Sequence, residues 1–107
     1  MKEIKAIVRP ARMKELRRSL LALPDFPGMT VISCRGVTAP GLKPETTFKE
    51  ELVDYSDNVC LLIVAENAQV EAIVAAIRRT ATTGRLGDGV LWVTAVENWE
   101  RLASPQQ

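Results

Sequence analysis

Residues 82–89 read Thr82-Thr83-Gly84-Arg85-Leu86-Gly87-Asp88-Gly89. This stretch follows a segment of helical periodicity and precedes a short apolar run of the kind that forms a strand. Three glycines around one aspartate predict a turn whose backbone N–H groups can approach an anion closely, because glycine has no Cβ. A purely structural interpretation stays open, in which Gly84 ends the helix and Asp88-Gly89 turns the chain into the strand.

Outward from this turn, the hydrophobic pattern predicts four strands and two helices. The predicted strands cover residues 2–9, 29–36, 59–65 and 90–96. The helices cover residues 12–23 and a second segment that begins at Asn67, a favourable N-cap, and ends at Gly84. Their apolar stripes are Met13, Leu16, Leu20 and Leu23, then Val70, Ile73, Val74, Ile77 and Ala81. The continuous apolar run at 59–65 is typical of a central strand that is buried on both faces.

The order of these elements predicts a single ferredoxin-like α+β domain over residues 1–107, of the form βαββαβ, with an antiparallel sheet and both helices on one face. Since no third helix is predicted for the other face, we expect the chain to self-associate. Residues 37–57 form a long loop between the second and third strands, either a solvated segment or an effector arm that orders against a partner. The tail, residues 97–107, is polar apart from Trp99 and Leu102 and is expected to fray after Arg101.

Composition excludes several classes of function. The net charge of +1 gives no basic surface for nucleic acid, and the absence of histidine removes the commonest general base and metal ligand. Cys34 and Cys60 lack the spacing of a metal motif, and the adjacent Glu50 and Glu51 diverge in an extended segment. We therefore expect no enzyme, no metal site and no nucleic-acid partner. No apolar run approaches about 20 residues and no signal-peptide core is present, so we expect a cytoplasmic protein without membrane insertion.

Three stretches resemble the PII signal-transduction family in order and spacing. The turn at residues 83–90 is similar to the family's loop, Thr-Gly-(Lys/Arg)-hydrophobic-Gly-Asp-Gly-(Lys/Arg). Residues 1–10 are similar to its N-terminal strand, and Gly28-Met29-Thr30-Val31 with Arg35-Gly36 is similar to its second strand. The resemblance covers nearly the whole chain.

This resemblance implies a homotrimer that packs its sheets around a threefold axis and binds an adenine nucleotide in each cleft between neighbouring subunits. It implies base and ribose contacts, backbone contacts, a phosphate-binding turn and a tail cation. The residues carried over are Ile7, Gly28, Thr30, Gly36, Val37, Thr38, Val64, Gly87, Asp88, Gly89 and Arg101. Core packing stays open as the alternative role of Ile7, Val37 and Val64.

Two cations of the family pattern are missing. Val90 stands where the family has lysine or arginine, and Ala103 stands where it has a second tail arginine. Each missing cation removes a charge-assisted contact to phosphate that is worth about 1.5–3 kcal/mol. We therefore expect ADP or AMP to be preferred over ATP.

The family's second ligand and its modification sites are altered too. Pro40 and Asn58 replace the glutamine and lysine that hold 2-oxoglutarate in the family, so we expect this ligand to bind weakly or not at all. Glu51 and Lys49 occupy the positions of the modified tyrosine and serine, and Tyr55 is expected to be a packing residue.

The predicted function is a divergent PII-like sensor with no covalent cofactor, which binds an adenine nucleotide and regulates a target, a membrane transporter, through its long loop. A second small ligand such as bicarbonate could take the place of 2-oxoglutarate, and nothing in the residues identifies the target protein or this ligand. Two alternatives stay open: a trimeric metal- or redox-responsive protein that uses Cys34 and Cys60, and a structural subunit whose nucleotide pocket has been lost.

Overall fold

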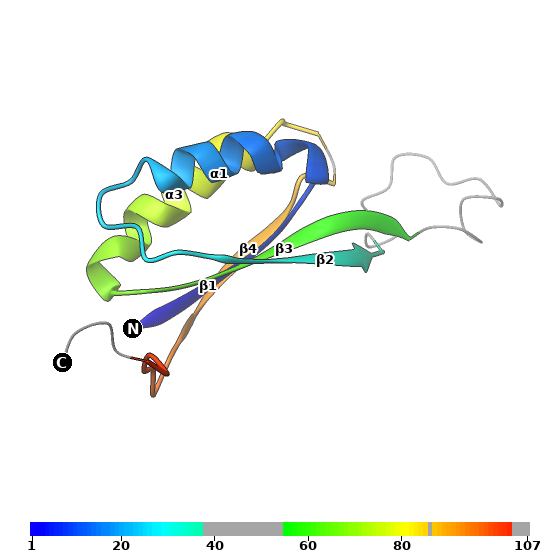
Figure 1. Ribbon diagram of the computed structural model, residues 1–107. Coiled ribbons are helices and arrows are strands. Elements are labelled where there is room, and N and C mark those ends of the chain that lie inside the picture. Colours follow the sequence, from blue (N-terminus) through cyan, green and yellow to red (C-terminus); the bar gives the residue numbers. More distant parts are fainter. Residues whose placement is uncertain (38–54, 86, 104–107) are drawn as a thin grey trace, which may run out of the picture.

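Four strands pair into one antiparallel sheet in the computed structural model, which describes residues 1–37, 55–85 and 87–103. The strands are β1 (Lys2–Val8), β2 (Thr30–Gly36), β3 (Ser56–Ala65) and β4 (Gly89–Ala95), in the order β2-β3-β1-β4 across the sheet (Figure 1). The helices are α1 (Met13–Leu21) and α3 (Val70–Ala81), each preceded by a short 3₁₀ turn, η1 (Pro10–Arg12) and η3 (Asn67–Gln69). Both helices lie on one face of the sheet, so the predicted ferredoxin-like α+β fold is confirmed.

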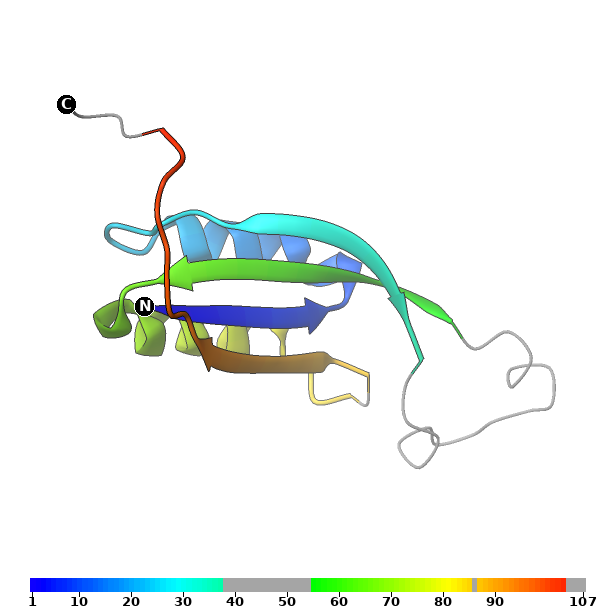
Figure 2. The same cartoon turned by 90° about the horizontal axis from the view of Figure 1, so that it is seen from below.

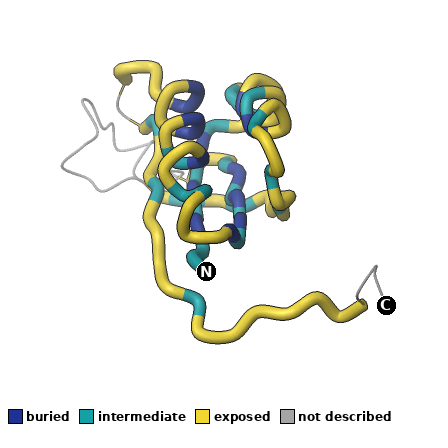
Figure 3. The backbone as a smooth tube through the Cα atoms, turned by 90° about the vertical axis from the view of Figure 1, so that its left-hand side faces the viewer, coloured by how far each residue is buried: buried dark blue, intermediate teal, exposed yellow. Residues whose placement is uncertain are grey.

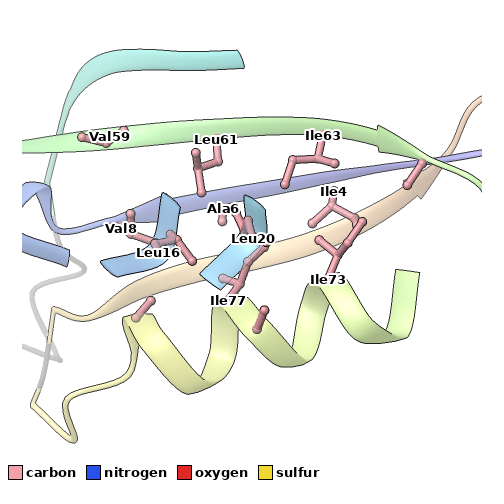
Figure 4. Packing of buried hydrophobic residues seen from close by; sticks show 13 residues of the cluster. Ile4, Ala6, Val8, Leu16, Leu20, Val59, Leu61, Ile63, Ile73 and Ile77 are labelled. Carbon is pink, nitrogen blue, oxygen red and sulfur yellow. The ribbon is translucent and has the colours of Figure 1, made fainter. Parts of the chain in front are cut away.

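The core lies between the two helices and one face of the sheet (Figure 4). Leu16 and Leu20 of α1 and Ile73 and Ile77 of α3 are at most 2% exposed, which confirms the predicted stripes. They meet alternate residues of the two central strands, because successive side chains of a strand point to opposite faces. The buried strand residues are Ile4, Ala6, Val8, Val59, Leu61, Ile63 and Ala65.

No element among the described residues covers the opposite face of the sheet, which Figure 2 shows in front of the helices. Directly opposed residues of an antiparallel pair point to the same side, so strand pairing places Ile32, Cys60, Ile7 and Val90 in one row across this open face. Ile32 is 46% exposed and Val90 is 59% exposed. An apolar row of this length supports the expectation of self-association.

The apolar run of β3 is buried less completely than its composition predicts. Val59, Leu61, Ile63 and Ala65 are buried, whereas the intervening residues are only half-buried. Burial on both faces is therefore wrong for a single chain, since the second face has no cover of its own. In Figure 3 the buried residues lie in the two helices and in the strands next to them, whereas the tail after β4 is almost entirely exposed.

Several predicted boundaries are wrong by a few residues. The third strand begins at Ser56 instead of residue 59, because Ser56, Asp57 and Asn58 pair with the end of β2 through backbone bonds that need no apolar side chain. Ser56 and Asp57 therefore belong to the strand and not to the loop predicted at 37–57. The first helix covers Met13–Leu21 instead of 12–23, because the chain enters it through the 3₁₀ turn that begins at Pro10.

The caps of the second helix also differ from the prediction. Glu66, not Asn67, is the N-cap of the 3₁₀ turn η3 that leads into α3, and it forms a capping box with Gln69. The helix ends at Ala81, because Thr82 already has an extended backbone (φ −80°, ψ 124°). Gly84 lies beyond this point with φ +83°, so it shapes the turn and does not end the helix.

Candidate functional site

The turn between α3 and β4 is organised around the carboxylate of Asp88. Its Oδ2 accepts hydrogen bonds from the backbone N–H groups of Thr83 (2.7 Å) and Gly84 (3.0 Å), and its Oδ1 accepts one from the Thr83 hydroxyl. Arg9, just after β1, adds an ion pair, with Nε 3.4 Å from Oδ1. The hydroxyl of Thr83, then its N–H, then the Gly84 N–H and the Arg9 charge hold the pKa of Asp88 below its usual value against the effect of burial. The side chain of Asp88 therefore fixes the turn.

Glycine is required at the end of this turn. Gly89 has φ +116°, and a Cβ at this position would overlap the backbone carbonyl of Ile7 on β1. Gly87 has φ +88°, and a Cβ there would lie 3.3 Å from Nη2 of Arg9. A side chain at either position would thus disturb the contact between the turn and the end of β1. Because both residues are glycine, the main chain of the turn can lie close to that strand.

At the other end of the sheet, an open surface cavity of about 710 Å³ brings four predicted nucleotide-binding residues together: Gly28, Thr30, Val64 and Arg101. They come from the segment before β2, from β2, from β3 and from the tail after β4. The lining also carries three carboxylates, those of Glu3, Asp25 and Glu66. The lining therefore combines apolar side chains with three carboxylates and one guanidinium.

The other predicted site residues lie away from this cavity. Ile7 is half-buried on the open face, opposite Val90, and Gly89 pairs with Val8. Gly36 ends β2, and Val37, which follows it, is 49% exposed. Together with Gly87 and Asp88 these residues lie toward the opposite end of the sheet, where β1 ends and β4 begins (Figure 2). Thr38 lies outside the described residues, as do Pro40, Lys49, Glu50 and Glu51.

The site residues therefore form two groups that one chain does not bring together. The cavity group lies near Met1 and the end of β4, and the turn group lies near Gly89 at its beginning. The seven residues of β4 separate them by about 20 Å at 3.4 Å per residue.

Sequence reasoning missed a residue that shapes the cavity wall. The side-chain amide of Gln69 donates to the carbonyl of Asp25 (2.7 Å), and its Oε1 accepts from the backbone N–H of Glu66 (3.0 Å). Asp25 has φ +53°, so this bond holds a strained turn that lines the cavity. The spacing of Glu66 and Gln69 is that of a capping box, and this signal is visible in the sequence.

The two cysteines share the open face but do not lie directly opposite each other. Cys34 pairs with Asn58, whereas Cys60 pairs with Ile32, so the thiols are offset by two positions. Diagonal neighbours of this kind have Cα atoms about 7–8 Å apart, beyond the usual range for a disulfide of about 4.4–6.8 Å. Among the described residues, no group of three or more side chains is placed to hold a metal ion.

Asn58 and Tyr55, at the base of the long loop, make weak contacts at the surface. The Asn58 amide donates weakly to the carbonyl of Ser56 (3.4 Å). The guanidinium of Arg35 lies 5.3 Å from the centroid of the Tyr55 ring, which is 62% exposed. Tyr55 thus packs on one cation at the surface.

Comparison with known proteins agrees with the fold. The family model for nitrogen regulatory protein P-II matches residues 1–105. The nitrogen regulatory proteins P-II of Azospirillum brasilense and Pasteurella multocida are 32% and 34% identical over 108 aligned residues, covering 100% of this chain and 96% of each relative. A nifHD-region GlnB-like protein of Methanothermobacter marburgensis is 35% identical over 92% of this chain and 90% of its own length.

The architecture and the glycine turn are those of a signal-transduction protein that works without catalysis. The chain belongs to the nitrogen regulatory protein P-II family. Within the described residues, no helix is both long and apolar enough to span a membrane.

Gly84 and Gly89 of the turn differ in what an added side chain would contact. We expect Gly89→Ala to lower the free energy of unfolding more than Gly84→Ala, since only Gly89 lies against the carbonyl of Ile7. Gly84 also has positive φ but open space around it, so alanine there costs only the strain of a left-handed residue, about 1–2 kcal/mol. Urea unfolding of both variants at one protein concentration measures the difference, and equal losses would refute the close contact.

Asp88 predicts an acid-dependent contribution to stability. Its pKa is lowered in the folded protein, so the folded state binds fewer protons than the unfolded state as pH falls. The stabilisation is present above the unfolded pKa of about 3.9 and is lost as pH falls through the lower folded value. We expect the stability advantage of the wild type over Asp88→Asn to shrink below about pH 4, as measured by thermal unfolding between pH 6 and pH 2. An advantage that stays constant over this range would contradict it.

Proposed function

We propose that this chain acts as a homotrimeric sensor of adenine nucleotides, which binds ADP or AMP in preference to ATP in the clefts between subunits. The observation that carries the proposal is the division of the candidate site into two groups at opposite ends of a sheet with one open face. A second copy packed on that open face supplies the missing half, so each cleft joins the cavity of one chain to the turn of its neighbour.

The charges of the two halves support one orientation of the ligand. Glu3, Asp25 and Glu66 line the cavity, so phosphates are disfavoured there apart from a contact to Arg101. Base and ribose are neutral and carry hydrogen-bond donors that carboxylates accept. Arg9 and Arg85 belong to the turn end, where the phosphates would meet main-chain N–H groups.

The preference for fewer phosphates rests on Val90 and Ala103. Val90 is 59% exposed beside Gly89, and Ala103 is exposed two residues after Arg101. Neither side chain can donate a hydrogen bond to phosphate. Two missing charge-assisted contacts weaken triphosphate binding by roughly two to four powers of ten.

The proposed target of regulation comes from the family resemblance and from one feature of the long loop. Residues 37–57 carry mixed charge and no modifiable tyrosine at the family position. The missing tyrosine is the feature that fits a membrane transporter as partner, with bicarbonate as a second small ligand, whereas the mixed charge of the loop does not choose among targets.

We expect calorimetric titration to give tighter binding of ADP and AMP than of ATP, and no saturable binding of 2-oxoglutarate below about 1 mM, with or without Mg-ATP. The reason is the loss of phosphate-binding cations and of the lysine at Asn58. Light scattering on the same sample measures the molar mass, which we expect to be that of a trimer. Comparable affinities for the three nucleotides would refute the preference for ADP and AMP. No detectable binding of any of them would refute the proposal that the protein senses adenine nucleotides.

Restoring the cations provides a gain-of-function test. We expect Val90→Lys combined with Ala103→Arg to raise the affinity for ATP at least tenfold more than the affinity for AMP, because the added charges meet the outer phosphates. The control is Val93→Lys with Leu102→Arg, which adds the same charges at exposed positions on the helix side of β4 and in the tail. An equal gain for both nucleotides, or the same gain in the control, would contradict the assignment.

A further inference from the structure

Trp99 lines the same cavity as Thr30, Val64 and Arg101, although it has no role in the site described so far. It lies in the tail after β4 and is 47% exposed. Phe26 and Met29, which line the same cavity, pack against the core. The indole of Trp99 is not part of that packing, so a large aromatic surface stands at the edge of the cavity.

The indole ring is held by a cation. The guanidinium of Arg101 lies 5.3 Å from the centroid of the Trp99 ring, within the range of a cation–π interaction. This contact orients the ring and links it to a residue of the candidate site. Trp92, the other tryptophan, has a different setting, because it lies within β4 on the open face with Lys5 6.0 Å from its ring.

We propose that Trp99 is a base-binding residue, on which the purine ring of the nucleotide stacks; this inference rests on the proposed function. Every base has a π-face, and a larger purine overlaps an indole more fully than a pyrimidine does. Glu3 and Glu66 line the same cavity, and a carboxylate accepts hydrogen bonds from an exocyclic amine such as that of adenine. Stacking and amine recognition together select adenine, whatever the number of phosphates.

The test compares Trp99→Ala, Trp99→Phe and Leu102→Ala by calorimetric titration with ADP, AMP and UDP. Loss of one stacking contact corresponds to about a tenfold loss of affinity. We expect Trp99→Ala to lose about tenfold for both ADP and AMP, with a smaller loss for UDP, and Trp99→Phe to retain most of the affinity. Leu102, which is fully exposed and does not line the cavity, is the matched control and should leave all affinities unchanged.

Fluorescence gives an independent readout. In Trp92→Phe, the emission comes from Trp99 alone, and we expect it to change on addition of ADP but not of inorganic pyrophosphate. Trp99→Ala binding ADP as tightly as the wild type, or fluorescence unchanged at saturating ADP, overturns the role of Trp99 and leaves the sensor in place. A wild type that binds no nucleotide overturns the proposed function and this inference with it.

Discussion

The sheet has helices on one face only, and the other features of the molecule depend on this asymmetry. The central strand β1 pairs along its whole length with β3 and with β4, and its residues Ile4, Ala6 and Val8 are buried in the core. Its odd-numbered residues face outward, where Ile7 continues an apolar row and Lys5 forms an ion pair with Glu3 (3.8 Å). The open face therefore carries an apolar row with polar groups beside it. This arrangement suits a second copy that packs on the apolar row and forms a cleft with the polar groups.

The sequence predicts which segments form the helices and strands of this fold better than it predicts where each of them begins and ends. The stripes of α1 and α3 follow from a period of 3.6 residues, which burial enforces. The start of β3 at Ser56 does not follow from the hydrophobic pattern, because backbone pairing with β2 extends the strand through polar residues. The cap at Glu66 was missed for a similar reason, since Asn67 has the higher intrinsic preference and only the bond to Gln69 decides between them.

The candidate site was predictable only through the family resemblance. Gly28, Thr30, Val64 and Arg101 are far apart in the sequence and meet because β2, β3 and the tail share one end of the sheet. No local pattern indicates that Trp99 belongs with them. The capping box of Glu66 and Gln69 is visible in the sequence, but the bond from Gln69 to Asp25 is a tertiary contact that only the structure shows. Conversely, the glycine turn is recognisable from the local sequence. Only the structure shows that the Asp88 carboxylate accepts hydrogen bonds from the backbone N–H groups of Thr83 and Gly84 in the same turn.

The N-terminus lies at the mouth of the cavity. Met1 is among the lining residues, and its carbonyl accepts a hydrogen bond from the N–H of Val96 (3.1 Å), where the chain leaves β4 for the tail. A purification tag fused before Met1 would emerge beside the cavity and place flexible peptide next to Trp99 and Arg101. Recombinant protein for ligand studies is therefore best produced with an untagged or cleaved N-terminus.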